Sequence, residues 1–274
     1  MTSHNQDGNQ VSDIFILALV GIAAGVLGGI LGIGGGTIMV PVMVALGLPG
    51  VEAVGTSTLA ILVIALVGTL QNWRMGFLNL KNLLLLGLPA VVTAFLGTRL
   101  ASAFPEYILL AIFGLFLLLN IYLVNLKKQI VARAKQREAQ GLAARPPQQI
   151  SPTLARTGIG GIAGFLAGLF GVGGGVVMVP LQILLLKEDI KTAIQTSLGA
   201  IVITGLSAFT WHSLSGNVQV STGLTLGLGG VIGVQVGTRV LPKLPDRTVT
   251  LLFSALLALL AVYFFYKAWG SYGG

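Results

Sequence analysis

Seven long stretches of this chain contain no Asp, Glu, Lys or Arg. They cover residues 14–51, 53–73, 82–98, 107–126, 157–186, 192–238 and 248–266. A membrane-spanning helix needs about 20 mainly apolar residues. Only 9% of the chain is charged, whereas a soluble domain has about 25%. We therefore expect an all-α polytopic membrane protein with at least six spans, and with eight hydrophobic segments if 192–238 divides at its polar residues 211–217.

The sequence contains an internal duplication. Residues 25–41 and residues 164–180 are identical at ten of seventeen aligned positions, with an offset of 139. After one inserted residue the match continues, pairing Thr56–Ser57 with Thr196–Ser197 and Gly97–Thr98–Arg99 with Gly237–Thr238–Arg239. Duplicated membrane units underlie many transporter folds. We predict two homologous repeats of about four hydrophobic segments each, at 14–126 and 157–270.

Polar segments flank the two repeats. Residues 1–13 form a polar tail without Lys or Arg, which argues against a cleavable signal peptide. Residues 127–156 carry seven of the sixteen basic residues, which predicts a cytoplasmic linker, with a short amphipathic helix before Pro146–Pro147. Residues 271–274 form a C-terminal tail. Because most of the net charge of +8 lies in such loops, it reflects membrane topology, and we expect no nucleic-acid partner.

Each repeat carries a glycine-rich motif followed by a proline, GIGGGTIMVP at 32–41 and GVGGGVVMVP at 171–180. One straight helix over 14–51 would be about 57 Å long, against about 30 Å of hydrocarbon. The segment must therefore break or turn back. Consecutive glycines allow non-helical dihedrals, and proline suits the first turn of a restarting helix. We expect breaks at Gly34–Gly36 and at Gly173–Gly175, in the first and fifth segments.

The basic residues distinguish two topologies. If the first and fifth segments cross completely, the repeats are parallel, and six basic residues lie outside against ten inside. If these segments are re-entrant hairpins, the repeats are inverted, both termini face outward, and only Arg99 and Lys267 lie outside, against fourteen inside. The positive-inside rule favours the inverted arrangement, although parallel repeats stay open.

The glycine breaks are the predicted binding site. Backbone groups freed at membrane depth need protein or water as partners, so each break predicts a cavity. The helix that starts after each break presents free N–H groups, which favour an anion. The expected substrate-binding residues are the break backbones and the neutral polar side chains that follow them, namely Gly34, Gly35, Gly36, Thr37, Thr56, Ser57, Gly173, Gly174, Gly175, Val176, Gln195, Thr196 and Ser197.

A second group of polar residues lies at equivalent places near the ends of other segments. They are candidates for a gate or an entrance, namely Asn72, Trp73, Arg99, Trp211, His212 and Arg239. Tryptophan also anchors helix ends at the membrane interface, and arginine snorkels to it, so a structural role stays open. His212 is the only imidazole in the predicted membrane segments and is a candidate for sensing protons.

Catalysis finds little support in the residues. The membrane segments contain no carboxylate pair, His-Glu metal motif or Ser-His-Asp set. Cysteine is absent, which excludes thiolate metal sites. We therefore expect neither an enzyme nor a metal site nor a cofactor.

Paired GxGGG motifs with their prolines, about 140 residues apart around a basic loop, resemble the TauE/SafE sulfite exporter family. The Thr-Ser pairs and the Gly-Thr-Arg sequences strengthen this resemblance. It implies transport of a small sulfur-containing anion, such as sulfite, sulfoacetate or another organosulfonate, usually outward across the bacterial cell membrane. A channel-like pore and a membrane scaffold that uses the basic linker stay open as alternatives. Direction, coupling ion and homo-oligomeric state do not follow from the sequence.

Overall fold

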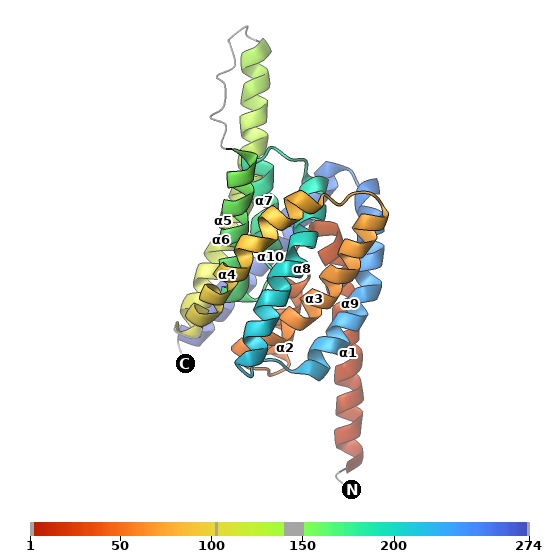
Figure 1. Cartoon of the computed structure of the whole chain (residues 1–274). Helices are drawn as coiled ribbons and strands as arrows, with labels where there is room; N and C mark the ends of the chain where they lie inside the picture. Colours follow the sequence, from red (N-terminus) through yellow and green to blue (C-terminus); the bar gives the residue numbers. More distant parts are fainter. Residues whose placement is uncertain (1–2, 102–103, 140–150, 273–274) are drawn as a thin grey trace.

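The computed structural model describes residues 3–101, 104–139 and 151–272 (Figure 1). The first half contains α1 (Ser3–Leu31), α2 (Gly36–Ala45), α3 (Gly50–Arg74), α4 (Leu80–Ala101) and α5 (Glu106–Ala139). The second half contains α6 (Pro152–Phe170), α7 (Gly175–Leu185), α8 (Ile190–Leu214), α9 (Val220–Val240), the 3-10 helix η1 (Leu241–Lys243) and α10 (Asp246–Tyr272).

The helices form a bundle suited to lipid. Within the described residues, seven helices are long and apolar enough to cross a membrane, namely α1, α3, α4, α6, α8, α9 and α10. Large apolar side chains such as Val92, Leu228 and Leu259 are exposed on its outside, where lipid rather than water is the solvent. The prediction of an all-α polytopic membrane protein is confirmed.

Close helix contacts fix the directions in the first half. They are Gly21 with Leu226 and Gly29 with Thr238 for α1 against α9, and Leu59 with Gly223 and Gly68 with Val234 for α3 against α9. Residue numbers rise together in every pair, so α1 and α3 both run parallel to α9. The short α2 between them therefore returns the chain to the side from which α1 came.

The second half repeats this arrangement around α4. The contacts are Gly160 with Leu86 and Gly168 with Ala94 for α6, and Gly199 with Leu83 and Ser207 with Val91 for α8. Helix α7 therefore also returns the chain. Helices α3 and α8 are antiparallel, because Thr69 lies against Leu198 and Leu62 lies near Gly205. Corresponding helices of the two halves thus run in opposite directions.

The bundle has two ends, which we name by the chain. At the terminal side α1 enters and α10 ends, and at the linker side α5 leaves and α6 begins (Figure 1). Among basic residues with described side chains, Arg99 and Lys267 lie at the terminal side. The others lie at helix ends of the linker side, namely Arg74, Lys81, Arg156, Lys187, Lys191, Arg239, Lys243 and Arg247.

The region between the halves is partly helical. Helix α5 continues to Ala139, so residues 127–139 extend a membrane helix rather than forming a separate one. Residues 140–150, which include Pro146–Pro147, lie outside the described residues. Helix α6 starts where the hydroxyl of Ser151 accepts from the Leu154 N–H at 3.2 Å and a proline follows directly, which is a favourable N-terminal cap.

Candidate functional site

The two glycine motifs fold in the same way. Their left-handed residues are Gly32, Gly34 and Gly35, with φ of 68°, 74° and 82°, and Gly171, Gly173 and Gly174, with φ of 65°, 73° and 77°. Residues with a Cβ are disfavoured at such dihedrals, which is why glycine occupies them. Gly35 is the N-cap of α2 and Gly174 is the N-cap of α7. Each motif therefore ends a long helix and starts a short one that returns.

The two breaks contact each other in the middle of the bundle. The Ser57 hydroxyl donates to the carbonyl oxygen of Gly171 at 3.0 Å, and the Ser197 hydroxyl donates to that of Gly32 at 2.9 Å. Each hydroxyl has one proton, which it shares between this carbonyl of the opposite break and a carbonyl of its own helix, that of Val54 or Ile194. A Cβ at Gly175 would collide with the Gly32 carbonyl oxygen. The contact between the breaks therefore depends on the two serine hydroxyls and on glycine at position 175, which has no Cβ.

Two isoleucines fill the centre between the breaks. Ile61 and Ile201 are fully buried, and a γ-methyl group of each lies close to both Gly34 and Gly173. The space between the starts of α2 and α7, at the predicted binding site, is therefore packed. Thr37, in the first turn of α2, is fully buried there, and its hydroxyl has no hydrogen-bond partner. It is an unsatisfied polar group beside the first N–H groups of that helix.

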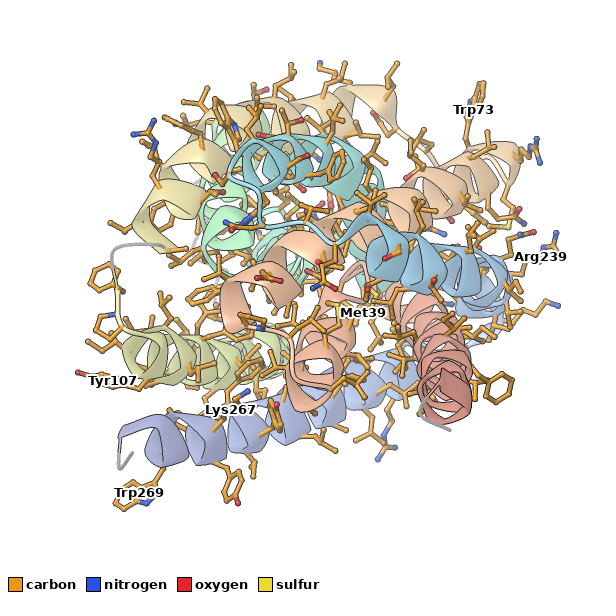
Figure 2. All side chains as sticks on the ribbon, turned by 90° about the horizontal axis from the view of Figure 1, so that it is seen from below. Met39, Trp73, Tyr107, Arg239, Lys267 and Trp269 are labelled. Atoms are coloured by element: carbon orange, nitrogen blue, oxygen red, sulfur yellow. The ribbon has the colours of Figure 1, made fainter. Side chains whose placement is uncertain are left out.

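A cavity of about 380 Å³ lies on the terminal side and extends to the second break. Its lining includes Val40, Pro41 and Val44 of α2, Val51 and Val54 of α3, Leu109 and Phe113 of α5, Phe170 and Val172 at the break, His212 of α8, and Phe264 and Lys267 of α10. Val51 is 42% exposed and marks the outer end. Seen from the terminal side, Lys267 lies between α5 and α10 (Figure 2). The wall is mainly apolar, with two nitrogen-bearing side chains.

The equivalent region on the linker side is filled. In the internal duplication, Val40, Val44, Val54, Leu109 and Phe113 correspond to Val179, Ile183, Ile194, Val249 and Phe253. All five counterparts are buried, whereas Val44, Val54 and Leu109 are only half-buried. The halves thus share a sequence pattern and differ in packing, because side chains on the linker side occupy the space that is a cavity on the terminal side.

Ion pairs join the helix ends of the linker side. Arg156 of α6 pairs with Glu188 before α8 at 2.6 Å, with side chains 15% and 12% exposed. Lys191 of α8 lies 3.6 Å from Asp246 of α10 and donates to the Pro242 carbonyl at 3.0 Å. The positions of Arg156, Glu188 and Lys191 correspond to Leu17, Leu48 and Val51 in the first half. These three residues cannot form ion pairs, so the terminal side lacks the same links.

Asn72 and His212 occupy equivalent buried positions near the ends of α3 and α8. Each is 1% exposed, and Asn72 Oδ1 and both ring nitrogens of His212 lack a partner at hydrogen-bond geometry. The backbone of Gly168 lies close enough to interact with the His212 ring. In contrast, Trp73 is 65% exposed, and Arg239 is exposed at the rim of the bundle (Figure 2). Asn72 and His212 are therefore buried, whereas Trp73 and Arg239 of the same group of gate or entrance candidates are exposed.

The other predicted residues do not line the cavity, and some of them hold neighbouring helices and loops in place. Arg99 is exposed and lies over the Phe95 ring at 5.0 Å, and Trp211 packs on the same ring at 4.4 Å. The Thr56 hydroxyl accepts from the Gln219 N–H at 2.9 Å, which fixes the loop before α9. Val176, Gln195 and Thr196 are buried beside the first break and the core. Apart from His212, none of the predicted residues lines the cavity.

Sequence reasoning did not identify most of the cavity wall. Val54, Phe113 and Phe170 are ordinary apolar residues, and their counterparts in the duplication are similar, so no chemical signal marks them. Lys267 could have been found from the sequence. In the inverted topology it and Arg99 are the only basic residues on the side opposite the linker.

Comparison with known proteins agrees with this architecture. A probable membrane transporter protein of Bacillus subtilis, YunE, is 27% identical over 270 residues, covering 92% of this chain and 97% of YunE. A probable membrane transporter protein of a Sinorhizobium species, ORF9, is 30% identical over 226 residues, covering 82% of this chain and 81% of the relative.

No solved structure matches the chain at a significant level. The model of the family described as "Sulfite exporter TauE/SafE" matches residues 17–264, which include both glycine breaks and the whole cavity region up to Phe264. Together with seven long apolar helices in the described residues, this match makes the chain a multi-pass membrane transporter that belongs to the TauE/SafE sulfite exporter family.

Proposed function

We propose that this protein is a secondary transporter that exports a small sulfur-containing anion, such as sulfite, sulfoacetate or another organosulfonate. The observation that carries the proposal is the cavity that extends from the terminal side to the second glycine break, while its counterpart on the linker side is filled. A transporter needs a site that is reachable from one side at a time, and this difference between equivalent regions supplies it.

We further propose that the two halves are inverted repeats with re-entrant hairpins. The opposite directions of corresponding helices support this. The distribution of basic side chains supports a cytoplasmic linker side in the cell membrane, because only Arg99 and Lys267 lie at the other end among those described. In this orientation the cavity faces outward, so the conformation is the one from which an exported anion leaves.

The chemistry around the cavity favours an anion. Among the side chains that the structure describes, no Asp or Glu lines it, and Lys267 is near its mouth. Beyond its inner end, α2 and α7 present the N–H groups of their first turns, which favour negative charge. The free Thr37 hydroxyl adds a neutral donor beside α2. The low dielectric of the apolar wall strengthens each of these interactions.

The packed centre favours a transporter over a channel-like pore. Ile61 and Ile201 close the path between the breaks, so an anion passes only when the helices move. Transport then requires a conformational cycle and saturates with substrate concentration. A pore with the same selectivity would conduct without saturation.

The test is flux in proteoliposomes that contain the purified full-length chain. We expect saturable transport of labelled sulfite or sulfoacetate, and competition by the unlabelled anion. Gly174→Leu should abolish it, because the N-cap of α7 has a φ of 77° that leucine rarely adopts. Gly158→Ala is the matched control, since a Cβ there meets no atom within 4 Å. Absence of flux for all sulfur anions by the unmodified protein would overturn the proposal.

A further inference from the structure

We infer that His212 and Asn72 are the substrate-contacting polar side chains of two vestibules that open alternately, one on each side of the membrane. The inference rests on the proposed transport function. The terminal-side vestibule is the cavity with His212 in its wall, and the linker-side vestibule is the same space in the other half, now filled by the apolar cluster around Val179, Ile183 and Phe253.

The duplication pairs these two residues. Asn72 and His212 differ by the offset of 140 that also pairs Thr56 with Thr196. Each lies two residues before the last residue of its helix, α3 or α8, and each is 1% exposed. Since α3 and α8 are antiparallel, the pair marks equivalent depths at opposite ends of the bundle. A substrate contact that His212 makes on the terminal side can therefore be made by Asn72 on the linker side.

Both side chains have polar atoms without a partner. The side-chain oxygen of Asn72 and the ring nitrogens of His212 make no hydrogen bond of good geometry, although the Gly168 backbone lies near the ring. Buried polar groups are nearly always satisfied, so an exception needs an explanation such as a ligand or a second conformation. Interfacial anchoring does not explain them, because that role needs exposure, as Trp73 has.

The geometry identifies the kind of ligand group. His212 is a polar side chain in a wall that is otherwise mainly apolar, and a carboxamide occupies its place in the other half. An imidazole N–H is a donor, and the Asn72 carboxamide becomes one at this place when it turns so that its NH2 group replaces Oδ1, the atom that lacks a partner here. A neutral donor suits an oxyanion that must bind and then leave, because it avoids the strong hold of a fixed charge. The ligand group is therefore a sulfur oxyanion head, such as that of a sulfonate or of bisulfite.

Asn72 becomes accessible when the linker side opens. Opening requires that α7 separates from α5, and that the ion pairs of Arg156 with Glu188 and of Lys191 with Asp246 break. On the terminal side the equivalent gap beside α2 is bridged by a long hydrogen bond of 3.4 Å from the Tyr263 hydroxyl to the Pro41 carbonyl. If α7 separates while α2 closes against α10, the linker-side vestibule opens and the terminal-side vestibule closes.

The first experiment measures accessibility, and the natural absence of cysteine makes it direct. Single cysteines are placed at His212 and Asn72, with exposed Ser213 and Lys81 as controls for the two sides. We expect a water-soluble thiol reagent to label His212→Cys only from the terminal side and Asn72→Cys only from the linker side. The rate at Asn72→Cys should rise several-fold during transport, because the linker side then opens. Labelling of both from one side, or none at Asn72→Cys during transport, would overturn the inference.

The second experiment measures KM separately from each side with labelled sulfite or sulfoacetate. We expect His212→Leu to raise KM from the terminal side about tenfold, with little change from the linker side, because a hydrogen bond to a charged group is lost on one side. Asn72→Leu should show the reverse. His212→Asn should restore KM to within about threefold, because it supplies the donor found in the other half.

The outcomes separate this inference from the proposed function. If the unmodified protein moves no sulfur anion, the transport proposal fails, while the labelling pattern still tests the two vestibules. If the unmodified protein transports but the leucine variants leave both KM values unchanged, or raise both equally, the assignment of His212 and Asn72 fails alone. Circular dichroism and gel filtration of each variant exclude loss of the fold as the cause.

Discussion

The regions around α2 and α7 begin with the same motif and end in different packing. Beside α2 lies a cavity, and beside α7 the equivalent side chains are in contact. One difference is at the position of Met43 and Gln182. The Gln182 amide donates to the carbonyls of Met178 and Ala193 at 3.2 and 3.3 Å, which ties α7 to α8, whereas Met43 has no group that could tie α2 to α3.

This comparison shows that a duplicated unit need not be in the same state twice. The shared residues, which are the glycines and serines of the breaks, build the frame. The residues that differ, such as Gln182 and Arg156, stabilise closure of the linker side. The following predictions test whether the frame is equivalent in both halves and whether the closure depends on the residues that differ.

The largest effect is expected where the breaks touch. Gly175→Leu places a side chain against the Gly32 carbonyl, and Gly36→Leu does the same at the Gly171 carbonyl. Each should destabilise the fold by more than about 4 kcal/mol and prevent recovery of monodisperse protein in gel filtration. If the frame is equivalent in both halves, the two variants behave alike. A well-folded variant at either position would break the equivalence.

The same enlargement should act differently in the two regions. Val44→Phe extends into the cavity, so we expect loss of transport with a change in stability below about 1 kcal/mol. Ile183→Phe, at the equivalent position, overpacks the closed cluster and should cost about 1–3 kcal/mol. Thermal unfolding in detergent and proteoliposome flux measure both. Equal stability losses would show that the cavity is not a real difference between the halves.

A smaller effect is expected from the linker-side ion pair. Arg156→Leu introduces the residue type found at the equivalent Leu17 and removes the partner of Glu188. For a partly exposed pair the loss is about 1 kcal/mol, which corresponds to a roughly fivefold faster labelling of Asn72→Cys from the linker side. Arg247→Leu, an exposed basic residue on the same side, is the control and should leave labelling unchanged.

The smallest effect concerns the serines of the frame. Ser57→Ala and Ser197→Ala each remove a hydroxyl that donates to the opposite break. Each loss should be below about 1 kcal/mol, the usual net value of one hydrogen bond, because the hydroxyl shares its proton with the Val54 or Ile194 carbonyl of its own helix. Thermal unfolding should give equal losses for both. Thr225→Ala, whose exposed hydroxyl bonds only its own helix, is the control. If one serine variant lost much more stability than the other, the two breaks would not be equivalent.

The sequence predicted the features that depend on chain geometry. Residues 14–51 are too long for one span, and the glycine motif predicts a break, which lies between the end of α1 at Leu31 and the start of α2 at Gly36. The expectation that Pro41 occupies the first turn of the restarting helix is wrong, because it lies further inside α2. The sequence also brought Ser57 and Ser197 close to the breaks, but not onto the opposite ones, because that contact depends on how the halves cross. The central packing of Ile61 and Ile201 could not be foreseen, since isoleucine is common throughout the apolar segments.

The asymmetry lay beyond the sequence for a physical reason. Val44 and Ile183 are similar residues in similar stretches of sequence, so neither indicates whether the space beside it is empty. Periodicity and composition are the same for a packed and for an open arrangement of these helices. Only the polar exceptions, Gln182, Arg156 and Lys191, differ between the halves in a way that a sequence could have linked to closure.

The pairing of α1 with α9 and of α6 with α4 has a consequence for assembly. The long arm of each hairpin packs through glycines against a helix of the other half, as Gly25 does against Gly230 and Gly164 against Ala90. Helix α1 of the first half therefore packs against the second half, and helix α6 of the second half packs against the first. Separately synthesised halves would leave these glycine faces uncovered in lipid, and only their co-insertion would restore the fold. The arrangement resembles an antiparallel dimer with exchanged helices, formed within a single chain.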